Sequence, residues 1–258
     1  MCVQVLLSLP VSYHPLFPMI KLFRLRLAKA WFAATHRGCW RALSLRVVPT
    51  IEHRGLIASL QIDQLIDVGA NRGQFSLMTR LEHPNIPIYG FEPLPSEGKV
   101  YRQVFARDAM VTLHEMALGD TIGTAEIHLS RRADSSSLLP IGDMQSKLFP
   151  RTDEIGTLRV RVVTLDDLQD VWRPARNALL KLDVQGFELS VLKGAKCALK
   201  NCAYVYAECS EIPLYTGQAL FPEVAAFLKD EGFKPVRRVN EQWVDGNLVQ
   251  ADHLFARV

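Results

Sequence analysis

Charged side chains stand at or near the carboxyl ends of several β-rich runs in the sequence. Asp67 lies in the first run, Glu92 directly follows the second, Lys181 and Asp183 close the fourth, and Glu208 closes the fifth. In open parallel sheets, ligands bind outside the carboxyl ends of the strands, near the point where the strand order reverses. If these runs are parallel strands, the charged side chains surround one ligand site, where they can bind polar groups and transfer a proton.

The turn after the first run, residues 67–73, reads DVGANRG. Gly69 removes a Cβ where a ligand must approach the backbone, and Gly73 lets the next helix start close to the strand. A dinucleotide-binding turn uses three glycines to seat a pyrophosphate, but Asn71 replaces the middle one. The acid at Asp67 suits a cationic ligand better than a diphosphate. S-adenosylmethionine, with its sulfonium and ammonium charges, is such a ligand, and a tight turn without any ligand is the alternative.

Two further segments favour a nucleoside. A carboxylate at the tip of the second strand can accept hydrogen bonds from both ribose hydroxyls, in NAD as well as in S-adenosylmethionine. The third strand leads into Ala117 and Leu118, a short apolar segment called the apolar step below, on which an adenine could lie. The predicted cofactor-binding residues are therefore Asp67, Gly69, Asn71, Gly73, Glu92, Ala117 and Leu118.

Lys181, Asp183 and Glu208 are the candidates for catalysis. Lys181 and Asp183 lie two residues apart on one face of an expected buried strand, which is rare without a reason, although a structural ion pair is the alternative. Asp183 and Glu208 belong to the rim of one pocket, where a raised pKa would suit a general base. No spacing of His, Asp or Glu requires a metal, and we expect none.

The elements that position these residues alternate in type after Gly55. Strands are expected at 64–68, 86–91, 111–116, 178–183 and 203–208, and helices at 74–81, 96–107, 189–199 and 222–231. This alternation predicts an α/β fold with a mostly parallel, seven-stranded, Rossmann-like sheet and helices on both faces. Runs at 124–129, 158–163 and 253–258 break the alternation and are expected as antiparallel or edge additions. Residues 130–156 are expected to form a loop, and loops of this length in a compact domain usually have a function.

The chain divides by charge into a basic arm and a weakly acidic body. Its 258 residues suffice for one α/β domain, expected at 56–258, and an N-terminal extension at 1–55. Seven of the 30 basic side chains lie in residues 1–51, where no acidic one occurs, which leaves 23 against 27 acidic residues in the rest. An acidic body without a basic, aromatic-studded face argues against a nucleic-acid partner.

The arm is predicted to contain an amphipathic helix over residues 16–34. Apolar residues recur there at spacings of four and three, namely Leu16, Ile20, Phe23, Leu27, Trp31 and Ala34. Such a basic helix can lie on an anionic membrane, and the alternative is that its stripe packs on the domain or on a second subunit in a homodimer. The five cysteines form no CxxC pattern, and neither a signal peptide nor a membrane span is indicated. We therefore expect a cytoplasmic protein that can associate peripherally with a membrane.

Five motifs, occurring in order, resemble the FkbM family of methyltransferases. They are IDVGANRGQFS at 66–76, FEP at 91–93, ALGD at 117–120, SSSLLP at 135–140 and KLDVQGFELSVLKGA at 181–195, and the similarity extends over roughly 56–258. The resemblance implies a class I methyltransferase fold, with S-adenosylmethionine contacts on Asp67, Gly69, Asn71, Glu92 and residues 117–118. Family members typically O-methylate sugars in glycans and glycolipids, or hydroxyls of secondary metabolites, so an acceptor of this kind is the expected partner.

Gln185 departs from the family pattern, which usually has Glu at this position. If that Glu is the base, this chain lacks it, and the role falls to Asp183 or Glu208. Methyl transfer from a sulfonium needs little acid–base help, because the sulfur leaves as a neutral thioether and the enzyme mainly aligns the acceptor and excludes water. Two other functions stay open: an NAD-dependent oxidoreductase, which the missing glycine opposes, and a non-catalytic, membrane-associated module that retains the fold.

Overall fold

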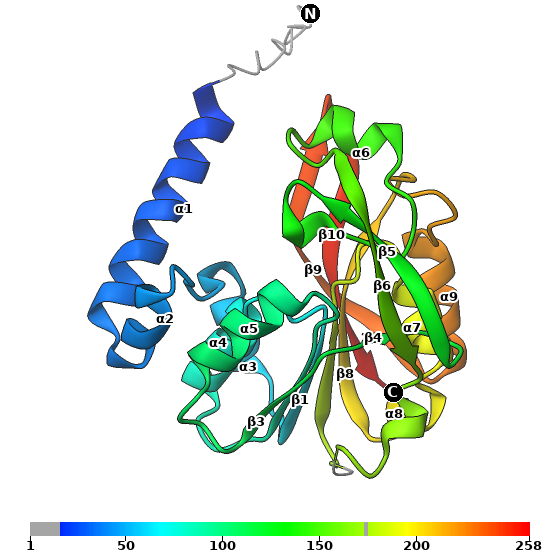
Figure 1. The fold of residues 1–258 in the computed structure, drawn as a ribbon, viewed down its shortest axis with the longest axis horizontal. Coiled ribbons are helices and arrows are strands. Elements are labelled where there is room, and N and C mark those ends of the chain that lie inside the picture. Colours follow the sequence, from blue (N-terminus) through cyan, green and yellow to red (C-terminus); the bar gives the residue numbers. More distant parts are fainter. Residues whose placement is uncertain (1–15, 173–174) are drawn as a thin grey trace, which may run out of the picture.

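A twisted sheet with helices on both faces forms the centre of the computed structural model, which describes residues 16–172 and 175–258 (Figure 1). Within these ranges its strands are β1 (Gln64–Val68), β2 (Ile88–Phe91), β3 (Val111–His114), β7 (Ala178–Leu182), β8 (Cys202–Ser210), β9 (Phe233–Val244) and β10 (Asn247–Arg257). They form one seven-stranded sheet in the order β3-β2-β1-β7-β8-β10-β9, in which β10 pairs antiparallel with both β8 and β9 and the other neighbours pair in parallel. The predicted fold class is confirmed.

The strand order reverses between β1 and β7, which pair in parallel from Gln64 and Ala178 to Val68 and Leu182. From β1 the chain continues outward through β2 and β3, whereas β7 leads outward to β8 in the other direction. Crevices at such a reversal are the usual ligand sites of open α/β sheets, because the two crossover connections diverge there.

Six of the helices in the described residues cover the two faces of the sheet. The helices of the described residues are α1 (Leu16–Thr35), α2 (Trp40–Ser44), α3 (Arg54–Ser59), α4 (Gln74–Glu82), α5 (Pro95–Val104), α6 (Asp143–Leu148), α7 (Glu188–Lys193), α8 (Lys196–Leu199) and α9 (Phe221–Asp230), with 3-10 turns η1 (Arg37–Cys39), η2 (Ile51–His53), η3 (Ala133–Ser135) and η4 (Asp166–Leu168). In Figure 1, α3, α4 and α5 lie on one side of the sheet and α7, α8 and α9 on the other.

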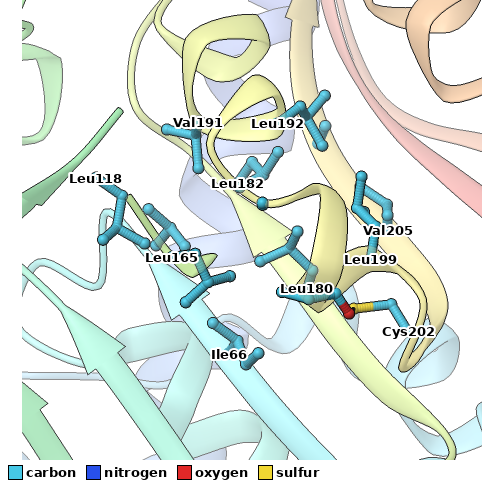
Figure 2. Packing of buried hydrophobic residues seen from close by; sticks show 14 of the residues in the cluster. Ile66, Leu118, Leu165, Leu180, Leu182, Val191, Leu192, Leu199, Cys202 and Val205 are labelled. Atoms are coloured by element: carbon cyan, nitrogen blue, oxygen red, sulfur yellow. The ribbon is translucent and has the colours of Figure 1, made fainter. Parts of the chain in front are cut away.

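Each face of the sheet has its own core, because successive strand residues point to opposite faces. On the α7–α9 side, Ile66 and Leu180 pack with Val191 and Leu192 of α7 and with Leu199 of α8 (Figure 2). The alternate residues of the same strands join the cluster on the α3–α4 side. Both cores keep the strands rigid beneath the site at their carboxyl ends.

Gly194 breaks the single helix that was expected at 189–199 into α7 and α8. A Cβ on Gly194 would lie only 1.9 Å from the carbonyl oxygen of Gly119, so the chain passes here in close backbone contact. Because Gly119 directly follows the apolar step of Ala117 and Leu118, this contact fixes that step against α7.

The three runs that break the alternation pair antiparallel, as expected, and the structure adds where each of them lies. The runs at 124–129 and 158–163 belong to a separate three-stranded sheet formed by β4 (Ala117–Leu118), β6 (Glu154–Val163) and β5 (Gly123–Ser130). The terminal run is part of β10, which is an inner strand, because β9 covers its outer edge. Sequence reasoning missed β9, whose residues are mostly exposed and which contains Pro235, a residue confined to edge strands and bulges.

The predicted N-terminal helix is confirmed as α1, which extends away from the sheet toward the N-terminus (Figure 1). Phe32 and Ala33 anchor its last turns in the core with α3, although both lie off the predicted stripe. Leu27 and Trp31 of the stripe are exposed, and the side chains of its earlier part, residues 16–23, lie outside the described ones. Among the described helices, none is long and apolar enough to cross a membrane.

Candidate functional site

The carboxyl ends of β1, β2 and β7 enclose a cavity of about 630 Å³, called the first cavity below. Gly69, Asn71, Glu92, Ala117 and Leu118 line it, as expected of the predicted cofactor residues. Its mostly apolar wall with a few polar groups is typical of a small-molecule site. The structure thus brings the tips of three strands around one space at the strand reversal.

Gly69 and Asn71 shape the turn that enters this cavity. Both have positive φ, 73° and 48°, and a Cβ on Gly69 would lie 1.9 Å from the carbonyl oxygen of Asp183. Only glycine fits at position 69, because the backbone that follows β7 passes directly against it. Asparagine tolerates the left-handed conformation better than most residues, which explains its place at position 71.

Glu92 is the buried carboxylate of the first cavity, with 5% of the residue exposed. It accepts hydrogen bonds from the backbone N–H groups of Asn71 and Leu94, each at 2.8 Å. Burial raises the pKa of Glu92 to about 7, although these two hydrogen bonds oppose the shift. A carboxylate held by the backbone in this way keeps lone pairs free for the two hydroxyls of a ribose.

Two predicted cofactor residues lie behind the cavity wall. Asp67 is fully buried, its Oδ1 lies 3.1 Å from Lys181 Nζ, and its Oδ2 accepts a 2.6 Å hydrogen bond from Ser76. Its charge is therefore balanced within the protein, which weakens the argument that it awaits a cationic ligand. Gly73, at the start of α4, makes room for the rings of Phe105 and Tyr101, so the observed contacts of this glycine are also internal.

Lys181 connects the tips of β1 and β7. Besides Asp67, its Nζ contacts Asp183 Oδ2 at 3.5 Å and the carbonyl oxygen of Gly69 at 3.0 Å. Burial alone would lower the pKa of Lys181, but Asp67 and Asp183 outweigh it, and the net pKa lies above the ordinary value. The lysine therefore stays charged as part of an ion-pair network, in agreement with the structural alternative left open by the sequence.

A second cavity of about 1040 Å³ adjoins the first. Four residues line both, namely Gly69, Asn71, Asp134 and Asp183. Asp183 has 40% of its side chain exposed, whereas Glu208 lines only a third, polar cavity of about 530 Å³. Of the two candidate bases, Asp183 is thus the one at the junction of the first two cavities.

Gln185 holds the two candidate bases together. Its Nε2 donates to Asp183 Oδ1 and to Glu208 Oε2, both at 2.7 Å, and its Oε1 accepts from the hydroxyl of Tyr215 at 2.8 Å. Burial and then the charge of Asp183 raise the pKa of Glu208 well above its ordinary value. An ionised glutamate at position 185 could not donate to either carboxylate, whereas the amide donates to both, which explains why an amide fits here.

Sequence reasoning gave no role to the residues that the segment at 130–156 brings to the site. Asp134, Ser136 and Ser137 line the first cavity, and Ser137 Oγ donates to the backbone oxygen of Gln185 at 2.7 Å. The length of the segment at 130–156 and its SSSLLP motif at 135–140 were the available signals, but neither could tell which side chains reach inward. Within the described residues, no three His, Cys, Asp or Glu side chains are grouped as metal ligands would be.

Comparison with known proteins decides among the functions that the sequence left open. Residues 67–235 match the model described as the methyltransferase FkbM domain, which is more than half of the chain. The chain belongs to the FkbM methyltransferase family. It is accordingly a methyltransferase with S-adenosylmethionine as its methyl donor, and the oxidoreductase and the non-catalytic module give way to this assignment. The first cavity fits this donor, since it offers a buried carboxylate for the ribose and an apolar step for the adenine.

Three relatives illustrate the range of the family. The chain is 29% identical to the 31-O-demethyl-FK506 methyltransferase FkbM of Streptomyces tacrolimicus, over 67% of this chain and 74% of that protein. It is 27% identical to the 2-O-methyltransferase NoeI of Sinorhizobium fredii, over 64% of this chain and 72% of that protein. It is 24% identical to the hexuronic acid methyltransferase AglP of Haloferax volcanii, over 78% of this chain and 82% of that protein.

The position of Glu92 leads to a prediction about pH. If the ionised carboxylate accepts the ribose hydroxyls, binding favours the charged form, so affinity is full above pH 7 and falls as the pH drops below the Glu92 pKa of about 7. Glu92→Gln should weaken S-adenosylhomocysteine binding at pH 8 by about 1–3 kcal/mol and remove most of the change between pH 8 and pH 6. Isothermal titration at both pH values measures this.

Glu188→Gln is the matched control, because Glu188 is also buried with a pKa raised to about 7, but its Oε1 accepts only from Val184 and Gly186 within the turn. It should retain the pH dependence of the wild type. An equal pH dependence in the wild type and in Glu92→Gln would show that Glu92 is not the ribose ligand.

Proposed function

We propose that this enzyme is an O-methyltransferase that acts on a hydroxyl of a sugar, in a glycan or glycolipid, or of a secondary metabolite. Asp183 lies at the junction of the first two cavities and lines both, so it can meet an acceptor hydroxyl beside a bound methyl donor. S-adenosylmethionine, when bound, supplies an electrophilic methyl group. The names of two relatives, the 31-O-demethyl-FK506 methyltransferase and the 2-O-methyltransferase, support transfer to oxygen.

The chain itself contributes alignment, exclusion of water and a proton acceptor. Buried walls around Glu92 and Leu118 keep water from the first cavity and fix the donor's orientation. Asp183 then accepts the proton of the acceptor hydroxyl as the carbon–oxygen bond forms. Lys181 and Gln185 hold this carboxylate in place from two sides, through its Oδ2 and its Oδ1 respectively.

Asp183→Asn and Glu208→Gln separate the two candidate bases. Asp183→Asn should lower turnover ~10²–10⁴-fold, the usual contribution of a positioned base, and leave S-adenosylhomocysteine affinity nearly unchanged. Glu208→Gln should change turnover much less, because Glu208 lies off the junction. The acceptor is first found by mass spectrometry of lipid and glycan extracts from cells with and without the gene, and turnover, affinity and thermal midpoint are then measured on each variant.

Near-normal turnover in Asp183→Asn would refute the role of Asp183 as base. A parallel loss of thermal midpoint, cofactor affinity and turnover would instead make Asp183 a structural partner of Lys181. Methylation of nitrogen or carbon on the identified acceptor would contradict O-methylation itself.

We also propose that the N-terminal arm binds an anionic membrane surface. Leu27 and Trp31 of α1 and Trp40 and Leu43 of α2 are exposed, Trp31 to 70%. Arg37 lies over the ring of Trp40, and residues 1–51 contain no acidic side chain that would repel anionic lipid. Exposed tryptophan beside arginine is typical of helices that lie in the interface of a bilayer.

Flotation with vesicles tests the arm. The full-length protein should float with phosphatidylserine-containing vesicles at low salt and less at high salt, because each basic residue near the surface contributes about 1 kcal/mol. The double variant Trp31→Ala/Trp40→Ala should float less, whereas Trp243→Ala, which removes a similarly exposed tryptophan from β9, should float like the wild type. Equal flotation of all three would contradict the proposal. If the wild type and Trp243→Ala are dimers and the double variant is a monomer, the exposed surface of α1 and α2 binds a second copy of the chain instead.

A further inference from the structure

The second cavity has walls from two different parts of the chain. One wall belongs to the N-terminal extension and includes Lys29, Thr50 and His53. The opposite wall belongs to the sheet and includes Lys181 and Tyr206. The extension lies outside residues 67–235, the part that the family model matches, so this wall is a feature of this chain that the family assignment does not describe.

Strand alternation explains why the sheet wall is polar. Tyr206 pairs with Leu254, and Glu208 pairs with Asp252, along β8 and β10, so these residues all point to the face that α3 and α4 cover. Further along the strands this face is apolar, but near the carboxyl end of β8 it becomes polar. The extension covers that polar end, since His53 closes η2 and its Nδ1 lies 2.9 Å from the Tyr206 hydroxyl.

Charge on the walls of the second cavity is compensated in pairs. Among the described residues that line it, every Lys and Arg lies against a carboxylate, and the pairs are Lys29 with Glu52 at 2.6 Å, Lys181 with Asp183 at 3.5 Å and Arg132 with Asp134 at 3.0 Å. Asp252 is a further carboxylate on the same walls. An anionic ligand would therefore meet more negative than positive charge and would have to displace an internal partner.

His53 contributes hydrogen bonding without charge. Burial lowers the pKa of His53 to about 4, so its imidazole is neutral at pH 7. Asn240 Nδ2 lies 3.1 Å from His53 Nδ1 and donates to Asp252 Oδ2 at 2.7 Å, which ties the imidazole into a network with the carboxylate. Neutral imidazole, phenol and amide groups together offer donors and acceptors that match hydroxyl groups.

We propose that the second cavity binds the methyl acceptor, that the N-terminal extension forms one wall of this site, and that the site selects an uncharged, hydroxyl-rich ring. This inference rests on the proposed O-methylation. Selection arises because a carboxylate or phosphate on the acceptor must separate an ion pair on the described walls to gain a cation, whereas a hydroxyl can exchange hydrogen bonds with the neutral pair of His53 and Tyr206 without separating charge. The acceptor hydroxyl then reaches Asp183 at the junction with the first cavity.

The first experiment asks which acceptors the full-length enzyme methylates. The enzyme is incubated with radiolabelled S-adenosylmethionine and cell glycan and glycolipid extracts that anion exchange has divided into neutral and acidic pools. We expect base-stable label, as in a methyl ether, at least tenfold enriched in the neutral pool. Base-stable label mainly in the acidic pool would overturn the inference while leaving O-methylation intact. No base-stable label in either pool would instead remove the proposed function.

The second experiment changes the wall that the extension provides. His53→Ala should raise KM for the neutral pool about tenfold with S-adenosylhomocysteine affinity changed less than twofold, because one hydrogen-bonding group is lost from the acceptor side alone. His128→Ala, which removes a histidine of β5 that lines none of the three cavities, is the matched control and should behave like the wild type. An unchanged KM in His53→Ala would contradict the role of the extension.

Glu52→Gln tests the charge argument and does not depend on the fold of the His53 variant. It frees Lys29 from its carboxylate partner, so the ratio of acidic to neutral acceptor methylation should rise several-fold. The thermal midpoint of each variant confirms that it is folded. An unchanged ratio in a folded Glu52→Gln protein would show that paired charge does not set the selectivity of the second cavity.

Discussion

The buried ammonium group of Lys181 is the constraint on which the site depends. It lies at the strand reversal, where it joins Asp67 of β1 to Asp183 after β7 and contacts the carbonyl oxygen of Gly69. A buried cation must be paired, and removing one partner from such a pair typically costs about 3–5 kcal/mol. The lysine therefore fixes the distance between the two strand tips, and with it the opening between the first and second cavities.

Conformational strain is concentrated around this same point. Gly69, Asn71 and Gln185 all have positive φ, and of the three only glycine adopts this conformation freely. Gln185 is held in this state by its contacts with Asp183 and Glu208, so its side-chain hydrogen bonds and its backbone conformation support each other. The site is thus preorganised by contacts within the protein, which is what a reaction that depends mainly on alignment requires.

Much of the fold and part of the site could be predicted from the sequence, because both depend on local patterns. Apolar, β-rich runs that alternate with helical stretches predicted β1, β2, β7 and β8. The motif that follows β1 predicted the turn at Gly69. Glu92 could be placed at the tip of β2 because it directly follows an apolar strand. The helix of the arm could be predicted from its spacing, but the exposure of Trp31 could not, since the residues that anchor α1 lie off the stripe.

The sequence by itself determined the family motifs, the strand–helix alternation and the types of residue available for chemistry. Only the tertiary structure decided how they are used. The charge of Asp67 predicted a cationic ligand, yet that charge is balanced by Lys181, which is distant in sequence. Sequence reasoning assigned no role to Gln185, although this side chain connects both candidate bases. His53 meets Tyr206 across 153 positions of the chain. Periodicity reports which face a residue occupies, whereas its partners across the sheet follow from strand order and register, which a single sequence does not encode locally.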